Sequence, residues 1–233
     1  MFKLTGEILK KLAPALPVER ALAYANQYTT ICPLYGINTA DIFHEFIAND
    51  IHESQGLTRF VEGLNYQAEA LAIKFSKPGK YGRRITIDDC YRYGRIRNRD
   101  KSIRPANQQA IANTIYGGAW GLANLGNKQQ GDGWLFRGSG EMMLTGRRMV
   151  TKFAAFYDKL NGTSFTPEQM AEMLRSNKEV STHAACWVFA IEKKLIPAAD
   201  ADKDLAIRKA INGGTFGLDE VLRLTRLARQ LVV

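Results

Sequence analysis

The chain has 233 residues, 45% of them hydrophobic, and a formal net charge of +9 at pH 7. This size and apolar content are enough to bury a sizeable core, so we expect a single domain over residues 1–233. No apolar run is long enough for a transmembrane helix, and three cysteines at irregular spacing argue against a disulfide framework. We expect a monomer that is made in a reducing cytoplasm without a signal peptide.

The first segment, residues 1–35, is predicted to form an N-terminal helix that packs onto the core, because apolar residues recur at helical spacing among charges. A second helix is predicted to begin after the N-cap Thr39 and to end at Gln55-Gly56, since glycine readily adopts the left-handed conformation that closes helices. The apolar residues of this second helix follow a helical period and are Ile42, Phe43, Phe46, Ile47 and Ile51.

Two carboxylates flank the predicted end of this helix. Glu62 follows Glu53 by nine residues, which along one continuous α-helix would turn about 900° and leave the side chains on opposite faces. A chain that folds back after Gly56 would instead set them across from each other. A pair of carboxylates on opposite walls of a cleft is the minimum for glycoside hydrolysis, one to donate a proton and one to activate water. Glu53 shares the azimuth of Ile42 and Phe46, and apolar surroundings would favour the protonated form that a general acid needs. Solvated, non-catalytic glutamates are the alternative.

The positive charge is concentrated between Lys74 and Arg104, a segment that contains eleven Lys or Arg and only three acidic residues. A short hairpin is predicted within this run, between Lys80 and Ile87. Interleaved tyrosines would suit nucleic acid, but no helix-turn-helix, zinc ligand set or RNA-binding signature accompanies them. We expect the run to face anionic polymers of a cell envelope, with a solvated surface and nucleic-acid binding as the alternatives.

A glycine-dense, aromatic-bearing segment follows, from Asn107 to Gly146. Such a segment is a poor helix or strand but suits the lining of a cleft, since glycine lets backbone approach a ligand and aromatic faces stack on sugar rings. Its strings occur in this order: Asn107-Gln108, Ala-Asn-Thr-Ile-Tyr116-Gly-Gly, Gly-Asp-Gly-Trp134-Leu-Phe-Arg137-Gly-Ser139-Gly and Leu-Thr145-Gly-Arg.

The last third is predicted to be helical. Apolar spacing predicts helices over residues 146–160, 181–195, 205–211 and 218–232. Thr166 followed by Pro167 is a strong helix start, and Cys186 within an apolar run is predicted to be a core thiol.

Taken with His52-Glu53-Ser54 upstream and Ile-Asn212-Gly-Gly downstream, the ordered strings resemble the family 19 glycoside hydrolases, most of all the branch of phage endolysins and bacterial enzymes. The resemblance runs from about Gly36 to Leu227, and the ordered set is far more specific than any one string. It implies a mostly α, lysozyme-like domain of two lobes with a central cleft and at most a small hairpin.

The resemblance also implies roles for particular residues. Glu53 corresponds to the general acid, Glu62 to the general base and Thr145 to the residue that holds the attacking water, in an inverting reaction. We expect a peptidoglycan hydrolase that cleaves β-1,4 bonds between amino sugars of the cell wall; a chitinase acting on N-acetylglucosamine polymers is the alternative. The side chains expected to bind substrate are His52, Asn65, Tyr66, Asn107, Gln108, Tyr116, Trp134, Arg137 and Asn212.

The sequence departs from the family pattern at several lining positions. These departures are Met143 for a usual glutamine, Ser139 for an arginine, Met149-Val150 for an asparagine-tyrosine pair and Val221 for an arginine. They fit an active enzyme with a changed substrate preference, and equally a weakened glycan-binding or virion-associated protein. Glu141 adds a third carboxylate near this lining, which we expect to lie in solvent.

No cofactor and no metal are predicted. His44-Glu45 and His52-Glu53 lack the His-Glu-x-x-His spacing of zinc peptidases, and eight residues do not align two histidines on neighbouring turns. A phosphate loop and a dinucleotide fingerprint are also absent from the sequence.

Overall fold

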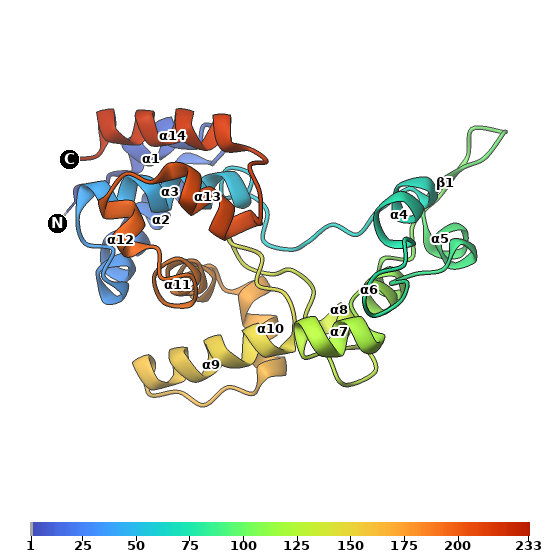
Figure 1. Ribbon diagram of the computed structural model, residues 1–233. Helices are drawn as coiled ribbons and strands as arrows, with labels where there is room; N and C mark the ends of the chain where they lie inside the picture. The colour runs from blue at the N-terminus through green and yellow to red at the C-terminus, as the bar shows by residue number, and fades with distance from the viewer. Residues whose placement is uncertain (1) are drawn as a thin grey trace. The chain divides into compact units, whose positions relative to one another are not determined.

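The computed structural model describes residues 2–233; Met1, where the predicted N-terminal segment begins, lies outside the described residues. The chain divides into two compact units. Unit 1 comprises the described residues up to Phe60 together with Gly140–Met143 and Met173–Val233, and unit 2 comprises Val61–Ser139 and Leu144–Glu172. The prediction of a mostly α fold is confirmed, since the named strands in the described part of the chain form one two-stranded sheet (Figure 1).

The elements of unit 1 are helices. In chain order they are α1 (Gly6–Leu12), α2 (Val18–Ile31), η1 (Cys32–Tyr35), α3 (Ala40–Glu53), α11 (Lys178–Trp187), η2 (Val188–Glu192), α12 (Ile196–Asp200), α13 (Asp204–Asn212) and α14 (Leu218–Leu231). The segment predicted as one N-terminal helix is therefore split into α1, α2 and η1. Pro17 is the N-cap of α2 and fixes an extended backbone there, which separates α2 from α1.

Helix α3 is the centre of unit 1. It begins after Thr39, whose hydroxyl oxygen accepts a hydrogen bond from the backbone N–H of Ile42 at 3.3 Å, as predicted. It packs against α12, α13 and α14, and every residue from Ile42 to Ile51 is buried. The rings of its Phe43 and Phe46 meet each other in a tilted arrangement, and both meet Tyr28 of α2 edge-to-face. An amphipathic period predicts burial of one face only, so the buried polar face of α3 must be satisfied by partners from elsewhere in the chain.

Unit 2 holds the strands and the remaining helices. In chain order its elements are α4 (Ala68–Phe75), α5 (Ile87–Tyr93), β1 (Ile96–Arg97), β2 (Ile103–Arg104), α6 (Gln108–Ile115), α7 (Gly118–Leu125), α8 (Asp132–Leu135) and α9 (Arg147–Asn161). Helix α10 (Pro167–Ser176) crosses the division between the units. Its predicted start is confirmed: Thr166 and Gln169 exchange side-chain to backbone hydrogen bonds at 3.2 and 2.9 Å.

The hairpin predicted between Lys80 and Ile87 is wrong. The observed hairpin pairs Ile96 with Arg104 and Arg97 with Ile103, and Figure 1 shows it extending away from α4 and α5. The region 80–87 instead contains a turn closed between Gly79 and Gly82 and the N-cap of α5. The alternation of polar and apolar residues in this region is too short to specify a strand. Thr86 instead caps α5, because its hydroxyl accepts a hydrogen bond from the N–H of Asp89 at 3.1 Å.

The core of unit 2 is a cluster gathered from α4, α5, α6 and the loops beside them. Its buried members are Leu64, Leu71, Phe75, Ile85, Cys90, Ile111, Ala112 and Ile115. Tyr66, Tyr116 and Trp134 pack against this cluster while remaining half-buried. Three aromatic residues that we predicted to bind substrate therefore lie at the edge of the unit 2 core. In the described chain, no helix has the length and apolar character of a membrane span.

Candidate active site

Glu53 is the last residue of α3, and the helix ends where the glycine signal predicts. The backbone N–H of Gly56, at φ 76°, donates to the carbonyl of Ile51 at 2.7 Å, which closes the helix in the left-handed conformation. The side chain of Glu53 is 23% exposed. The helix end therefore leaves this carboxylate accessible at the boundary of the unit 1 core.

The apolar surroundings predicted for Glu53 are wrong, because a buried guanidinium reaches it. Arg208 of α13 donates from Nη1 to Glu53 Oε1 at 2.6 Å, and the side chain of Arg208 is only 1% exposed. The same arginine donates from Nε to the carbonyl of Phe216 at 2.8 Å. Asn49 Oδ1 lies 3.4 Å from Nη1. Arg208 thus connects α3, α13 and the loop after α13, and it fixes one oxygen of the Glu53 carboxylate.

His52 and Asn212, both predicted to bind substrate, lie in the surroundings of this arginine. His52 Nδ1 is 2.8 Å from Glu220 Oε2, and its imidazole ring fills the space beside Gly217. Asn212 donates from Nδ2 to the Phe216 carbonyl at 2.8 Å and accepts from the N–H of Gly214 at 2.8 Å. The side chain of Asn212 therefore shapes the loop whose carbonyl holds Arg208; its contact with substrate stays a prediction.

Glu141 does not lie in solvent, as we expected, but is fully buried in unit 1. Its carboxyl group interacts with that of Asp50 on α3, which is also fully buried, and with both groups ionised Asp50 Oδ1 and Glu141 Oε2 would have no hydrogen-bond donor among the described residues. Thr182 donates to Glu141 Oε1 at 3.0 Å, and Tyr28 donates to Asp50 Oδ2 at 2.6 Å.

Two carboxyl groups can share a hydrogen bond only when one of them is protonated. Burial raises the pKa of Asp50 to about 7. Burial, reinforced by the charge of Asp50, raises the pKa of Glu141 well above its ordinary value. The pair therefore retains a proton at neutral pH inside the unit that carries Glu53.

Glu62, in unit 2, is held by two donors. The hydroxyl of Tyr116 donates to Glu62 Oε1 at 2.6 Å, and the backbone N–H of Gly138 approaches Oε2 at 3.2 Å. The backbone of Glu62 also donates to the Gly138 carbonyl at 2.8 Å, so residue 62 is tied to the glycine-rich segment by main chain and side chain together. Burial and the charge of Glu62 raise the pKa of Tyr116, so the phenol stays a donor.

Gly138 leaves the space that the neighbours of Glu62 require. A Cβ at this position would lie 3.3 Å from Glu62 Oε2 and 3.3 Å from Thr145 Oγ1. The carboxylate oxygen and the hydroxyl therefore border the same small space beside Gly138, where a methyl group would make tight contacts with both. The structure thus brings the predicted Thr145 close to Glu62.

The other predicted binding residues of unit 2 divide into two groups. Trp134 stacks with Arg137, whose guanidinium carbon lies 3.6 Å from the indole centroid, and Tyr66 is half-buried and packs edge-to-face on Phe75. Asn65 is exposed.

The side chains of Asn107 and Gln108 hydrogen-bond to the backbone of unit 2. The Asn107 side chain caps α6 by accepting from the N–H of Ala110 at 3.0 Å, and Gln108 accepts from the N–H of Leu64 at 3.0 Å. Gln108 thereby positions the segment that leads to Glu62. Their contact with substrate stays a prediction.

An ion pair that the sequence analysis did not identify joins two of the motif strings. Arg147, from the Leu-Thr-Gly-Arg string, donates from Nη2 to Asp132 Oδ1 at 2.7 Å and from Nη1 to Glu168 Oε1 at 2.6 Å. Burial opposes ionisation of Asp132, but hydrogen bonds from Arg147 and from the N–H groups of Gln129 and Lys128 lower its pKa. Each of these two strings therefore supplies one partner of the buried ion pair between Arg147 and Asp132.

Three of the residues that depart from the family pattern, Ser139, Val150 and Val221, lie in the interior. Ser139 is 1% exposed and donates its hydroxyl to the carbonyl of Arg137 at 2.9 Å, and Val221 is fully buried in α14. Met143 adopts a positive φ of 48° in the turn that begins at Gly140, and Met149 is half-buried in α9. Ser139 and Val221 therefore contribute to packing in this chain.

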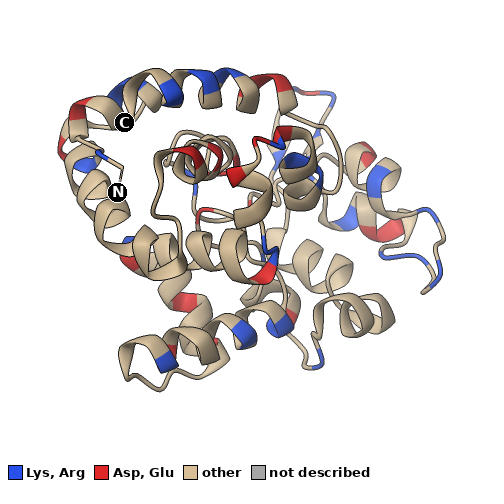
Figure 2. Ribbon diagram, turned by 60° about the vertical axis from the view of Figure 1, so that its left-hand side comes forward, with Lys and Arg blue, Asp and Glu red and all other residues tan. Residues whose placement is uncertain are grey.

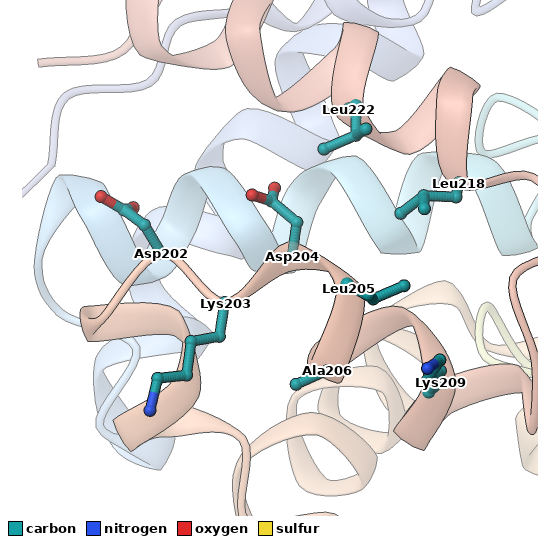
Figure 3. Close-up of a pocket in the computed structure, with 8 residues that line it drawn as sticks. All are labelled: Asp202, Lys203, Asp204, Leu205, Ala206, Lys209, Leu218 and Leu222. Carbon is teal, nitrogen blue, oxygen red and sulfur yellow. The ribbon is translucent and has the colours of Figure 1, made fainter.

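A pocket in unit 1 lies between the start of α13 and the first half of α14 (Figure 3). Its lining consists of Asp202, Lys203, Asp204, Leu205, Ala206, Lys209, Leu218 and Leu222. None of the predicted site residues belongs to this lining. Over residues 2–233, His, Cys, Asp and Glu form no group of three or more that could hold a metal ion.

The comparisons with known proteins agree with the resemblance seen in the strings. No protein-family model matches the sequence. The chain is similar to a Haemophilus influenzae protein described as a "Glycosyl hydrolase family 19 domain-containing protein". The two are 31% identical over 181 residues, which cover 78% of this chain and 75% of that protein.

Proposed function

The chain belongs to glycoside hydrolase family 19, and on that premise we propose that it is a peptidoglycan hydrolase that cleaves β-1,4 bonds between amino sugars with inversion. Membership also identifies its helical architecture as the mostly α, lysozyme-like fold. In the proposed reaction Glu53 is the general acid, Glu62 is the general base, and Thr145 helps to hold the attacking water. We further propose that the protein acts on the cell wall after synthesis in the cytoplasm.

The observation that carries this proposal is the setting of Glu62. Its two oxygens accept from Tyr116 and Gly138, so the carboxylate has a defined orientation before any substrate arrives. A general base is effective when its lone pair points at the water that it deprotonates. The small space bordered by Glu62 Oε2 and Thr145 Oγ1 supports a role for both groups in holding that water.

The proposed acid role of Glu53 is supported by the difference between its two carboxylate oxygens. Arg208 binds Oε1, and no hydrogen bond from another described residue engages Oε2. The proton delivered to the leaving oxygen would therefore reside on Oε2, while Oε1 keeps the side chain in one orientation. Glu53 belongs to unit 1 and Glu62 to unit 2.

The test is release of reducing ends from purified peptidoglycan, with chitin oligomers assayed in parallel. We expect the wild-type protein to be active on peptidoglycan and the variants Glu53→Gln and Glu62→Gln to lose at least a hundredfold in kcat. Glu69→Gln, which removes an exposed carboxylate of α4, is the matched control and should retain activity. Proton NMR of the first product formed should show the inverted anomer.

The outcomes separate the alternatives. Activity on chitin oligomers alone would replace the proposed substrate by that of a chitinase. A folded wild-type protein that binds glycan but releases no reducing ends from either polymer would establish the weakened, binding-only alternative. Full activity of Glu62→Gln would refute the assignment of the base.

A second part of the proposal concerns the basic surface, defined as the exposed side chains Lys77, Lys80, Arg83, Arg97, Arg99 and Lys101. Figure 2 shows lysine and arginine in blue along the projecting part of unit 2. Nearby acids serve local structure instead: Asp100 accepts from Ser102, and Asp89 accepts from Thr86. We propose that this surface attracts anionic polymers of the cell envelope.

The basic surface is tested by co-sedimentation with cell walls that retain or lack their anionic polymers, over a range of salt concentrations. We expect binding to the intact walls to weaken steeply with salt, and Arg97→Gln combined with Arg99→Gln to reduce it. Tighter binding to duplex DNA than to the walls under the same salt conditions would favour the nucleic-acid alternative.

A further inference from the structure

Arg84 is a cation built into the aromatic surroundings of Glu62, and sequence reasoning did not single it out. Its guanidinium carbon lies 3.6 Å from the ring centroid of Trp120 and 4.6 Å from that of Phe75. Nε donates to the carbonyl of Ile115 at 2.9 Å, at the end of α6. Stacking on two rings and one hydrogen bond fix the plane of the guanidinium.

Tyr116 connects this guanidinium with the proposed base. The centroid of the Tyr116 ring lies 5.5 Å from the guanidinium carbon of Arg84, and its hydroxyl donates to Glu62 at 2.6 Å. Burial lowers the pKa of Arg84, while the charges of Tyr116 and Glu62 oppose that effect. Arg84 is therefore close enough to Glu62 for their charges to interact.

The terminal nitrogens of Arg84 remain available for a ligand. No carboxylate of residues 2–233 forms an ion pair with Arg84, and its hydrogen bond to Ile115 uses Nε alone. The side chain of Arg84 is half-buried, so part of it remains accessible to solvent. A guanidinium with one satisfied edge and one open edge has the geometry that binds a carboxylate through two parallel hydrogen bonds.

The candidate substrates differ in the chemistry that such a group recognises. Chitin is an uncharged polymer of N-acetylglucosamine. In peptidoglycan every second sugar carries a lactyl ether, whose carboxyl group is either free or amide-linked to a peptide that has carboxylates of its own. Chitin therefore offers no carboxylate to a cation beside Glu62, whereas peptidoglycan does.

We propose that Arg84 binds a carboxylate of the substrate beside the scissile bond and thereby selects lactyl-bearing glycans over chitin. This inference rests on the proposed function and names the substrate feature that the site reads. Trp120 and Phe75 hold the guanidinium in place, and Tyr116 sets its position relative to Glu62. Arg84 is a specificity residue that takes no part in proton transfer.

The test measures equilibrium binding in the Glu53→Gln background, so that turnover does not consume the ligand. Three oligosaccharides of equal length are compared: one with free lactyl carboxylates, one with those carboxylates reduced to alcohols, and one that retains its stem peptides. We expect Arg84→Met to weaken binding of the free-carboxylate form about tenfold or more, and of the reduced form less than twofold. Lys159→Met, which removes an exposed cation of α9, is the control and should weaken neither.

The third ligand distinguishes the two sources of a carboxylate. A loss confined to the free-carboxylate form identifies the lactyl group, whereas a loss on the peptide-bearing form identifies the stem peptide. Arg84→Lys keeps the charge without the planar fork, and it should bind the free-carboxylate form with intermediate affinity.

A purely structural role for Arg84 would change binding of the charged and reduced ligands by the same factor, and that result would overturn the inference. Failure of the proposed function has a different signature, since it appears as a wild-type protein without turnover. The ratio of the two affinities is unaffected by any general loss of folded protein, which a melting curve of Arg84→Met would report separately.

Discussion

Glutamine in place of Glu141 tests whether the buried pair with Asp50 holds a proton. A glutamine amide is the uncharged analogue of the protonated carboxyl group: it can donate to Asp50 and accept from Thr182, as Glu141 does. The substitution therefore keeps the packing and the hydrogen bonds of the native pair. It removes only the possibility of ionisation at residue 141.

The magnitude follows from proton linkage. An unfolded glutamate has a pKa of about 4.3, so between pH 6 and pH 8 residue 141 is ionised in the unfolded chain. Burial raises the pKa of Glu141 well above that value in the folded protein, which therefore holds one proton more than the unfolded chain. Over the pH range in which residue 141 is ionised in the unfolded chain and protonated in the folded protein, the unfolding free energy of the wild type falls by about 1.4 kcal/mol per pH unit relative to the variant.

Other titrations cancel in the comparison. Burial raises the pKa of Asp50 to about 7 and that of Glu45 to about 8, and each lowers the stability of both proteins as pH rises through these values. Glutamine presents Asp50 with the same neutral donor that protonated Glu141 presents. The difference between the two proteins therefore isolates residue 141.

Urea denaturation followed by circular dichroism at pH 6, 7 and 8 gives the required free energies. We expect Glu141→Gln to gain stability relative to wild type at each step, and Glu19→Gln, which changes an exposed carboxylate of α2 in the same unit, to show no such trend. A difference between wild type and Glu141→Gln that stays constant from pH 6 to pH 8 would refute the shared proton.

Three further substitutions have defined outcomes. Gly138→Ala places a methyl group 3.3 Å from Glu62 Oε2, and we expect kcat to fall at least tenfold while the melting temperature changes little. Tyr116→Phe removes the 2.6 Å hydrogen bond to Glu62, so kcat should fall about tenfold with an unchanged circular dichroism spectrum. Arg147→Met leaves Asp132 buried without its partner and should lower the unfolding free energy by about 3–5 kcal/mol at pH 7. Because the folded pKa of Asp132 is lowered, that loss should shrink as pH falls below about 4, where urea denaturation would reveal it.

Local signals in the sequence predicted many of the elements and their ends. The cap at Thr39, the glycine stop after Glu53 and the start at Thr166 all depend on hydrogen bonds within a few residues, so they are visible in a short window. The predicted helix over 181–195 appears as α11 followed by the π-helical turn η2, and the predicted closing helix appears as α14. The hairpin was misplaced because alternation over five residues is a weak signal beside a helix cap.

The candidate site was predicted in part. The ordered strings identified the family and the residues proposed for catalysis, and unit 2 indeed brings Tyr116, Gly138 and Thr145 to Glu62. The strings did not reveal that Asn107 and Gln108 serve the backbone. Side-chain amides bind backbone and sugar with the same chemistry, so their residue types alone do not distinguish the two roles.

The helical class, the main helix ends and the family can therefore be predicted from the sequence, because they depend on periodicity, caps and motif order. The surroundings of Glu53 and the burial of Glu141 depend on how distant segments pack. Arg208 is 155 residues from Glu53, and no local pattern links them. A period of apolar residues marks one buried face of α3, whereas the polar face is buried by partners whose identity emerges only when distant segments pack together.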